Sequence, residues 1–163
     1  MSESSKTVTW QDPRPTAAAA LQLSGLDFLT KIIAGEIPPP PIARSLGYDL
    51  VEVSQGHALF EVRPDDSHYN PIGVVHGGLA LTLLDSAAGC AVQSTLPKGL
   101  GYTSLETKVN FLRAITADSG LLRARGWVTK PGKRAAFAEA DLRDADGTLY
   151  ATASSTCLVF PVG

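Results

Sequence analysis

The chain has 163 residues, of which 44% are apolar and 18% are charged, and its net charge at pH 7 is −2. This composition is too apolar for a disordered chain, and the balanced charge gives no overall field that would attract nucleic acid. No apolar run approaches the roughly 20 residues of a membrane-spanning helix, and the first residues lack the apolar segment of a secretory signal. The two cysteines, Cys90 and Cys157, form no CxxC pair. We therefore expect a soluble, reduced, cytoplasmic protein that binds neither nucleic acid nor membrane.

The first 41 residues divide into a tail, a helix and a connector. Residues 1–15 are polar and contain prolines, which predicts a flexible tail. Residues 16–34 follow a helical pattern, in which Ser24 followed by Asp27 resembles a helix start and Gly35 is placed to end the helix. The prolines of IPPPPI, residues 37–42, end any helix and form a rigid connector more readily than a ligand for another domain. We expect the connector to end at residue 41 and one folded domain to occupy residues 42–163.

The rest of the chain alternates in the manner of β-strands and is interrupted by one helix. YDLVEV (48–53) and HALFEVR (57–63) predict a hairpin around residues 54–56. An apolar helix is expected from residue 77 to about 94, followed by four strands over 102–113, 120–130, 134–144 and 148–160. Consecutive strands with short turns predict an antiparallel sheet. The fold class is therefore α+β, with the sheet curved around one central helix.

In the segment 102–113, strict alternation divides the side chains between two faces of the sheet. One predicted face carries Leu105, Thr107, Val109 and Phe111, and the other carries Ser104, Glu106, Lys108 and Asn110.

The predicted central helix has one polar stripe on an otherwise apolar surface. On a helical wheel this stripe, which we call the seam, consists of Gly78, Thr82, Asp85, Ser86, Gly89 and Gln93. Its glycines allow another backbone or a ligand to come close. Asp85 is either a buried carboxylate satisfied by hydrogen bonds or a functional group, because a buried carboxylate must be paired or change its pKa.

The start of the same helix offers free backbone donors. NPIGVVHGG, residues 70–78, leads from a loop into a first turn whose N–H groups have no intrahelical partner. Such a terminus carries roughly half a positive charge, so it binds an anion or polarises a carbonyl. His76 and Asp85 span about 13.5 Å of a straight helix and face opposite sides. Either only one is functional, or a two-fold dimer with antiparallel helices brings Gly77 of one chain beside Asp85 of the other.

Other polar residues have a structural and a functional interpretation. His76 either orients the loop from the helix N-cap region or contacts a substrate, whereas His57 and His68 are expected at the surface. KPGKR, residues 130–134, is a turn first and a phosphate site second. The sequence contains no HExxH, CxxC or Cys/His cluster and no GxSxG or P-loop motif. We therefore expect no metal site.

Three segments together resemble the hotdog-fold acyl-CoA thioesterases of the phenylacetate-degradation (PaaI-like) type: YNPIGVVHGGLALTLLDSAAG, GYTSLETKVNFLR and KPGKRAAFAEADL. The resemblance covers roughly residues 42–160. It implies a helix wrapped in an antiparallel sheet, and dimers or dimers of dimers with active sites at the subunit interface. It also implies hydrolysis of an acyl- or aryl-acyl-CoA thioester to free acid and CoA, with water as co-substrate and no cofactor.

The resemblance also implies roles for single residues. Asp85 matches the acid that acts as general base or nucleophile, and Gly77 matches the residue whose N–H polarises the thioester carbonyl. Asn70 and His76 match polar residues that orient this region and the substrate. The residues implied in contacts with substrate or CoA are Gly78, Gly89, Phe111, Arg113, Lys130, Gly132, Lys133 and Arg134.

One feature departs from the family pattern, and two other functions remain open. In one hotdog branch the acid is Glu and a Thr follows one turn later, whereas here the acid is Asp85 and that position is Gly89. Ser104, or alternatively Thr103, matches a hydroxyl that positions water in some relatives. The alternatives are an acyl-CoA-binding sensor without turnover, and a hydroxyacyl thioester dehydratase or hydratase. His76 is the candidate base for the latter reaction.

Overall fold

The computed structural model describes residues 3–162. Its helices are α1 (Pro13–Ala20), α2 (Gly25–Ile33), α3 (Pro41–Leu46) and α4 (Gly77–Gln93). Its strands are β1 (Tyr48–Ser54), β2 (His57–Val62), β3 (Leu100–Phe111), β4 (Leu122–Lys130), β5 (Ala135–Asp144) and β6 (Leu149–Pro161). From residue 48 onward these elements follow the predicted order, and α4 begins at the predicted residue.

The single helix predicted over residues 16–34 is wrong, because this stretch belongs to two helices. The Asp12 side chain accepts the Arg14 N–H, and α1 begins within the predicted tail, at Pro13. Ser24 then starts a second helix by accepting the Asp27 N–H. A further short helix, α3, begins at Pro41, since proline fits a first helical position where no N–H is needed.

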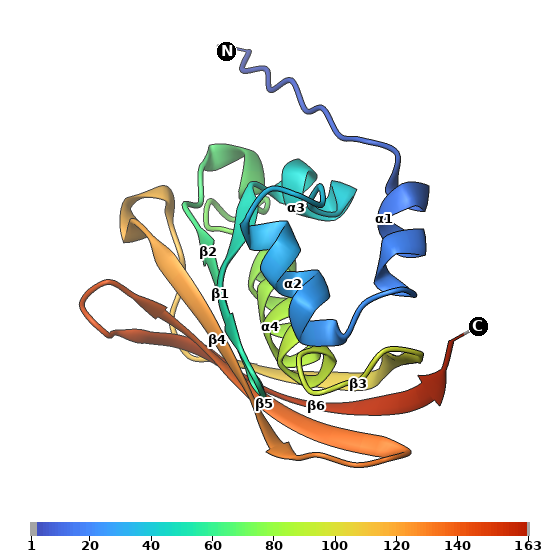
Figure 1. The fold of residues 1–163 in the computed structure, drawn as a ribbon. Coiled ribbons are helices and arrows are strands. Elements are labelled where there is room, and N and C mark those ends of the chain that lie inside the picture. Colours follow the sequence, from blue (N-terminus) through green and yellow to red (C-terminus); the bar gives the residue numbers. More distant parts are fainter. Residues whose placement is uncertain (1–2, 163) are drawn as a thin grey trace.

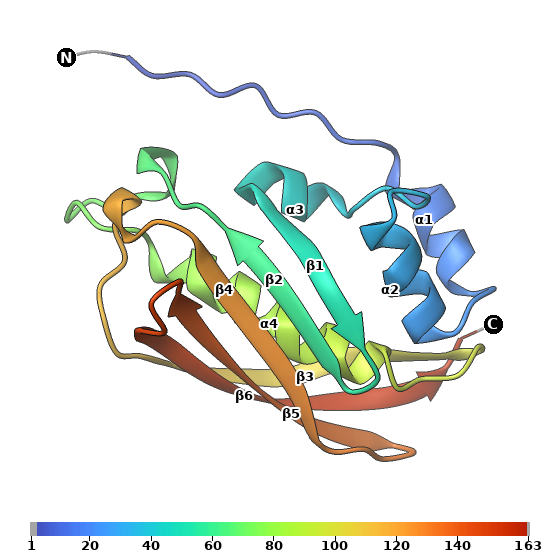
Figure 2. The same cartoon turned by 60° about the vertical axis from the view of Figure 1, so that its left-hand side comes forward.

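The six strands form one antiparallel sheet in the order β1-β2-β4-β5-β6-β3. The sheet curves around α4, which lies against its concave face (Figures 1 and 2). Leu83, Leu84, Ala87 and Ala88 of α4 are fully buried in the core. The predicted α+β architecture, a curved antiparallel sheet around one central helix, is confirmed.

The two edges of the sheet differ in their surroundings. At the β1 edge, α2 and α3 pack against the strand (Figure 2). At the other edge, β3 is twelve residues long and pairs on one side only, with β6, within residues 3–162. A long strand with an open edge is a template for pairing with another chain.

A β-bulge interrupts β3 at Leu105. Ser104 lies opposite Cys157 and Glu106 lies opposite Thr156, so Leu105 is an extra residue in the ladder. Leu105 points outward and is 61% exposed, while Ser104 and Thr107 are both half-buried on the concave side. The prediction that Ser104 and Thr107 occupy opposite faces is therefore wrong, because a bulge shifts the alternation by one residue.

Within residues 3–162, every helix is too short or too polar to cross a membrane.

Candidate active site

The N-terminus of α4 is capped by His76. Its Nδ1 atom accepts the Gly78 N–H at 2.8 Å. A Cβ on Gly78 would lie 2.8 Å from the same nitrogen, so glycine makes room for the ring. The structural interpretation of His76, an N-cap, is thus the one observed. Its Nδ1 lone pair is occupied, which weakens the case for His76 as the base of a dehydratase.

The N–H of Gly77 remains unused by the described residues. As the first residue of α4 it has no intrahelical acceptor, and residues 3–162 supply no other. The Phe111 ring packs against the Cα of Gly77, since a Cβ there would lie 3.1 Å from two ring carbons. A hollow of about 410 Å³ opens here, lined by Val75, Gly77, Ala80, Phe111, Leu112, Arg113, Ala114 and Ile115. The structure therefore brings Gly77, Phe111 and Arg113 together around a free helix-terminal donor.

Asn70 shapes the loop that leads into α4. Its side-chain Oδ1 accepts the N–H groups of Ile72 at 3.0 Å and Val74 at 3.3 Å. Its backbone N–H donates to Val74 O at 2.8 Å. Asn70 thus closes a tight turn, and its carboxamide oxygen is already engaged within the loop.

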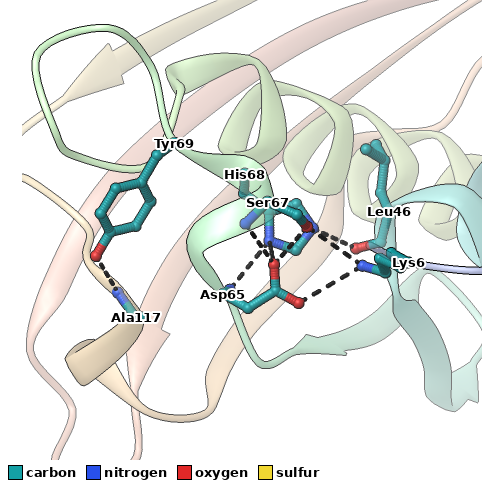
Figure 3. A network of polar contacts seen from close by, with 7 residues as sticks. All are labelled: Lys6, Leu46, Asp65, Ser67, His68, Tyr69 and Ala117. Atoms are coloured by element: carbon teal, nitrogen blue, oxygen red, sulfur yellow. Dashed lines mark hydrogen bonds and ion pairs between the residues drawn. The ribbon is translucent and has the colours of Figure 1, made fainter. Parts of the chain in front are cut away.

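A polar network anchors the same loop to the body of the protein (Figure 3). His68 Nδ1 accepts the Asp65 N–H at 3.0 Å, and its Nε2 contacts the Leu46 carbonyl at 3.1 Å. The His68 side chain is only 6% exposed, so the expectation of a surface histidine is wrong for this residue. The Asp65 pKa is lowered, first by a hydrogen bond from the Ser67 hydroxyl. This network fixes the approach to the N-terminus of α4.

Asp85 lies halfway along the seam of α4, and two hydroxyl groups from β3 hold it. Its Oδ1 atom accepts hydrogen bonds from Ser104 Oγ at 3.0 Å and from Thr107 Oγ1 at 2.7 Å. Its Oδ2 atom has no hydrogen-bond partner among residues 3–162. Ser104 therefore faces Asp85, whereas Thr103 is exposed on the outer face of β3. The sequence analysis missed Thr107, because strict alternation placed it on the face opposite Ser104.

Two ionisable side chains, Cys90 and Tyr102, are partly buried near the C-terminal half of the seam. Burial raises the pKa of Cys90 to about 12, with a smaller contribution from the charge of Asp85. Burial likewise raises the pKa of Tyr102 well above its usual value. The Tyr102 hydroxyl would lie 2.3 Å from a Cβ on Gly89. Within one chain, Gly89 is therefore covered by Tyr102, and both neighbouring ionisable groups stay neutral near Asp85.

The basic turn lies at the opposite end of α4. A hollow of about 860 Å³ joins Gly132 and Lys133 to Thr95, Leu96 and Pro97, which follow the helix C-terminus. Gly132 forms a tight turn, since a Cβ there would lie 1.9 Å from Ala135 O. The basic side chains of the turn are exposed; they are Lys130, Lys133 and Arg134. Because α4 is about 26 Å long, the predicted contact residues form two distant groups within a single chain. One group, with Phe111 and Arg113, lies at the N-terminus of α4, and the basic turn lies at its C-terminus.

No three His, Cys, Asp or Glu side chains within residues 3–162 cluster as metal ligands would. The chemistry that the site offers comes from a free N–H donor and a carboxylate oriented by hydroxyl groups.

Comparison with known proteins identifies this arrangement. The curved sheet around one central helix is the hotdog fold. A family model described as the thioesterase superfamily matches residues 72–151, which include α4, β3, β4, β5 and the start of β6. Human acyl-coenzyme A thioesterase 13 is 30% identical over 108 residues, which are 66% of this chain and 76% of the relative. The chain belongs to the thioesterase superfamily, and the predicted enzyme class, a thioester hydrolase, is confirmed.

Two solved structures extend the comparison. A phenylacetic acid degradation-related protein from Ralstonia eutropha JMP134 is 32% identical, with a TM-score of 0.72 over 80% of this chain and 98% of its own. The PaaI protein of E. coli, from the phenylacetic acid degradation operon, shares the fold at 22% identity, with a TM-score of 0.72 over 86% of this chain and 96% of its own. The resemblance to PaaI-like hotdog proteins is confirmed.

Proposed function

We propose that this protein is an acyl-CoA thioesterase whose active site is shared between two subunits. Gly77 of one subunit polarises the thioester carbonyl, and Asp85 of its neighbour activates water or attacks the carbonyl. One observation carries the proposal: within residues 3–162, neither the Gly77 N–H nor Asp85 Oδ2, both on α4, has a hydrogen-bond partner. Eight residues of helix separate them by about 12 Å, which is too far for both to act on one carbonyl within a single chain.

The proposed reaction follows from these two groups. Attack on the thioester carbon turns the carbonyl oxygen into an oxyanion, which the Gly77 N–H stabilises as it forms. In the general-base route, Asp85 Oδ2 takes a proton from water while water oxygen bonds to carbon. The C–S bond then breaks, and the CoA thiolate leaves and takes up the proton. In the nucleophilic route Oδ2 itself attacks, the C–S bond breaks and the CoA thiolate leaves, which gives a mixed anhydride. Water then hydrolyses the anhydride to the free acid and the Asp85 carboxylate, and the thiolate takes up the remaining proton. Neither route requires a cofactor.

A homo-oligomer built on β3 would produce this arrangement. A second copy that pairs antiparallel along the open edge of β3 continues the sheet and sets the two α4 helices antiparallel. The N-terminal end of one helix then approaches the middle of the other. This pairing also brings the hollow at Gly77 and Arg113 toward the partner's α4, and reduces the separation of the two groups of predicted contact residues.

Exposed cations provide the proposed contacts to CoA. Arg113 lines the hollow beside Gly77, and Lys133 lines the hollow at the far end of α4. Together with Lys130 and Arg134, they supply long cationic side chains suited to the diphosphate and ribose phosphate of CoA. The relative named acyl-coenzyme A thioesterase 13 supports the same substrate class.

Thiol release from a panel of short, long and aromatic acyl-CoAs tests the proposal. Asp85→Asn keeps the side-chain volume and removes the charge, and Asp118→Asn, an exposed site on a surface turn, is the control. We expect wild type and the control to release thiol from at least one substrate, and Asp85→Asn to lose about 10²-fold or more, as for a lost general base. Binding without thiol release by wild type favours the sensor. Hydration of enoyl thioesters in place of hydrolysis favours the hydratase.

A further inference from the structure

We infer that Thr107 is a positioning residue for Asp85, aimed by the β-bulge at Leu105. This inference deepens the proposed function and rests on Asp85 being the reacting carboxylate.

The bulge is what brings two hydroxyl groups to one carboxylate oxygen. Ser104 and Thr107 are three residues apart, so in a regular strand they face opposite sides. The extra residue, Leu105, reverses the alternation between them. Both hydroxyl groups therefore reach Asp85 Oδ1, with Thr107 Oγ1 closer at 2.7 Å than Ser104 Oγ at 3.0 Å. Of the two, Thr107 makes the shorter bond.

Counting protons shows where the Thr107 hydroxyl donates. Ser155 Oγ donates its single proton to the Glu106 carbonyl at 3.0 Å, beside the bulge. Ser155 Oγ also lies 3.2 Å from Thr107 Oγ1. Because the Asp85 carboxylate as an anion only accepts, the single Thr107 proton lies in the bond to Asp85. The single Ser155 proton lies in the bond to the Glu106 carbonyl, so the contact between Thr107 and Ser155 uses neither proton. Ser155 is 2% exposed and lies beside Thr107 in the interior.

The two bonds fix which oxygen of Asp85 is left to react. Both hydroxyl groups bind Oδ1, so Oδ2 keeps its lone pairs. Two donors from one rigid strand define the plane of the carboxylate, whereas a single donor permits rotation about Cβ–Cγ. Loss of the Thr107 hydroxyl should therefore lower kcat and leave substrate binding nearly unchanged, because misorientation of a reacting group costs rate more than affinity.

Three variants test the inference in the full-length oligomer. Thr107→Val keeps the shape and removes the hydroxyl, and Thr107→Ser keeps the hydroxyl. Thr156→Val is the control, because the Thr156 hydroxyl bonds Glu106 Oε1 at 3.2 Å, away from Asp85. With an acyl-CoA substrate, we expect Thr107→Val to lower kcat about 10-fold, as for a lost hydrogen bond to a charged group, with KM within about 2-fold. Thr107→Ser should recover most of kcat, and Thr156→Val should match wild type.

Two kinetic results overturn the inference while the thioesterase proposal stands: an unchanged kcat in Thr107→Val, or an equal loss in Thr107→Ser. If wild type hydrolyses no thioester, the proposed function fails, and crystal structures of wild type and Thr107→Val decide the inference separately. A carboxylate of Asp85 that takes more than one orientation only in the variant supports the positioning role. The same single orientation in both proteins contradicts it.

Discussion

Replacing Gly77 by proline removes one backbone N–H from the proposed site and adds a pyrrolidine ring beside Phe111. Gly77 is the first residue of α4, where proline is well tolerated. His76 has φ −62° and ψ 133°, the extended conformation that a residue before proline prefers. The helix should therefore form as in wild type. Losing one oxyanion donor costs about 2.7–4 kcal/mol of activation free energy, or a factor of about 10²–10³ in kcat.

The matched control for this substitution is Gly77→Ala. Both variants add a Cβ that meets the Phe111 ring at 3.1 Å, but only alanine keeps the N–H. The informative quantity is therefore the ratio of kcat between the two variants, measured by thiol release, with circular dichroism and gel filtration to check fold and assembly. We expect alanine to exceed proline by about 10²-fold or more. Equal kcat values in two correctly folded variants would refute the assignment of the Gly77 N–H.

Three further predictions concern the surroundings of the site. The Cys90 pKa of about 12, against an ordinary 9.0, makes its thiol about 10³-fold less ionised at pH 8 than in the unfolded chain. Native Cys90 should thus resist iodoacetamide in peptide mapping, and rapid labelling of the native protein would contradict this. The free energy of unfolding should also fall as pH rises above about 9, where only the unfolded thiol ionises. Gly126→Ala should lower the free energy of unfolding by about 1–3 kcal/mol in urea, because a Cβ there lies 2.1 Å from a backbone oxygen of α4. The control Arg125→Ala, at an exposed position, should lower it by less than about 0.5 kcal/mol. Equal losses in the two variants would contradict the close packing. The double substitution Lys133→Ala and Arg134→Ala should raise KM for acyl-CoA about 10-fold at low salt. The KM for the corresponding N-acetylcysteamine thioester, which lacks phosphates, should not change. An equal rise in both KM values would contradict a phosphate contact.

The central helix shows how far the sequence alone leads. The pattern of small and polar residues predicted both the bounds of α4 and the stripe that escapes burial, and Asp85 lies on that stripe half-exposed. Gly89 is the exception, since Tyr102 from β3 covers it. Helical periodicity is a local property, so the sequence predicts it. The side chain that covers Gly89 depends on where β3 lies in the sheet, which the local sequence does not predict.

The bulge in β3 shows where the sequence reading stopped. Nothing in TSLET, residues 103–107, marks Leu105 as an extra residue, because the shift in register arises from pairing with β6, fifty residues away in sequence. A one-residue shift in register moves every following side chain to the opposite face of the sheet, and it places Thr107 beside Asp85. Similarly, His68 contains no local signal of burial; its partner is the Leu46 carbonyl on a different element. Long-range pairing, rather than composition, decides these positions.

The most direct test of the shared site uses mixed oligomers of two inactive chains. Asp85→Asn and Gly77→Pro subunits with different tags are co-expressed, the mixed species is purified through both tags, and thiol release is compared with each parent. If Gly77 and Asp85 act from different subunits, each mixed dimer contains one site with both groups intact and one with neither. Our account predicts about half the wild-type activity from such dimers. Activity no higher than that of the two parents would show that each site lies within a single chain and would contradict the account.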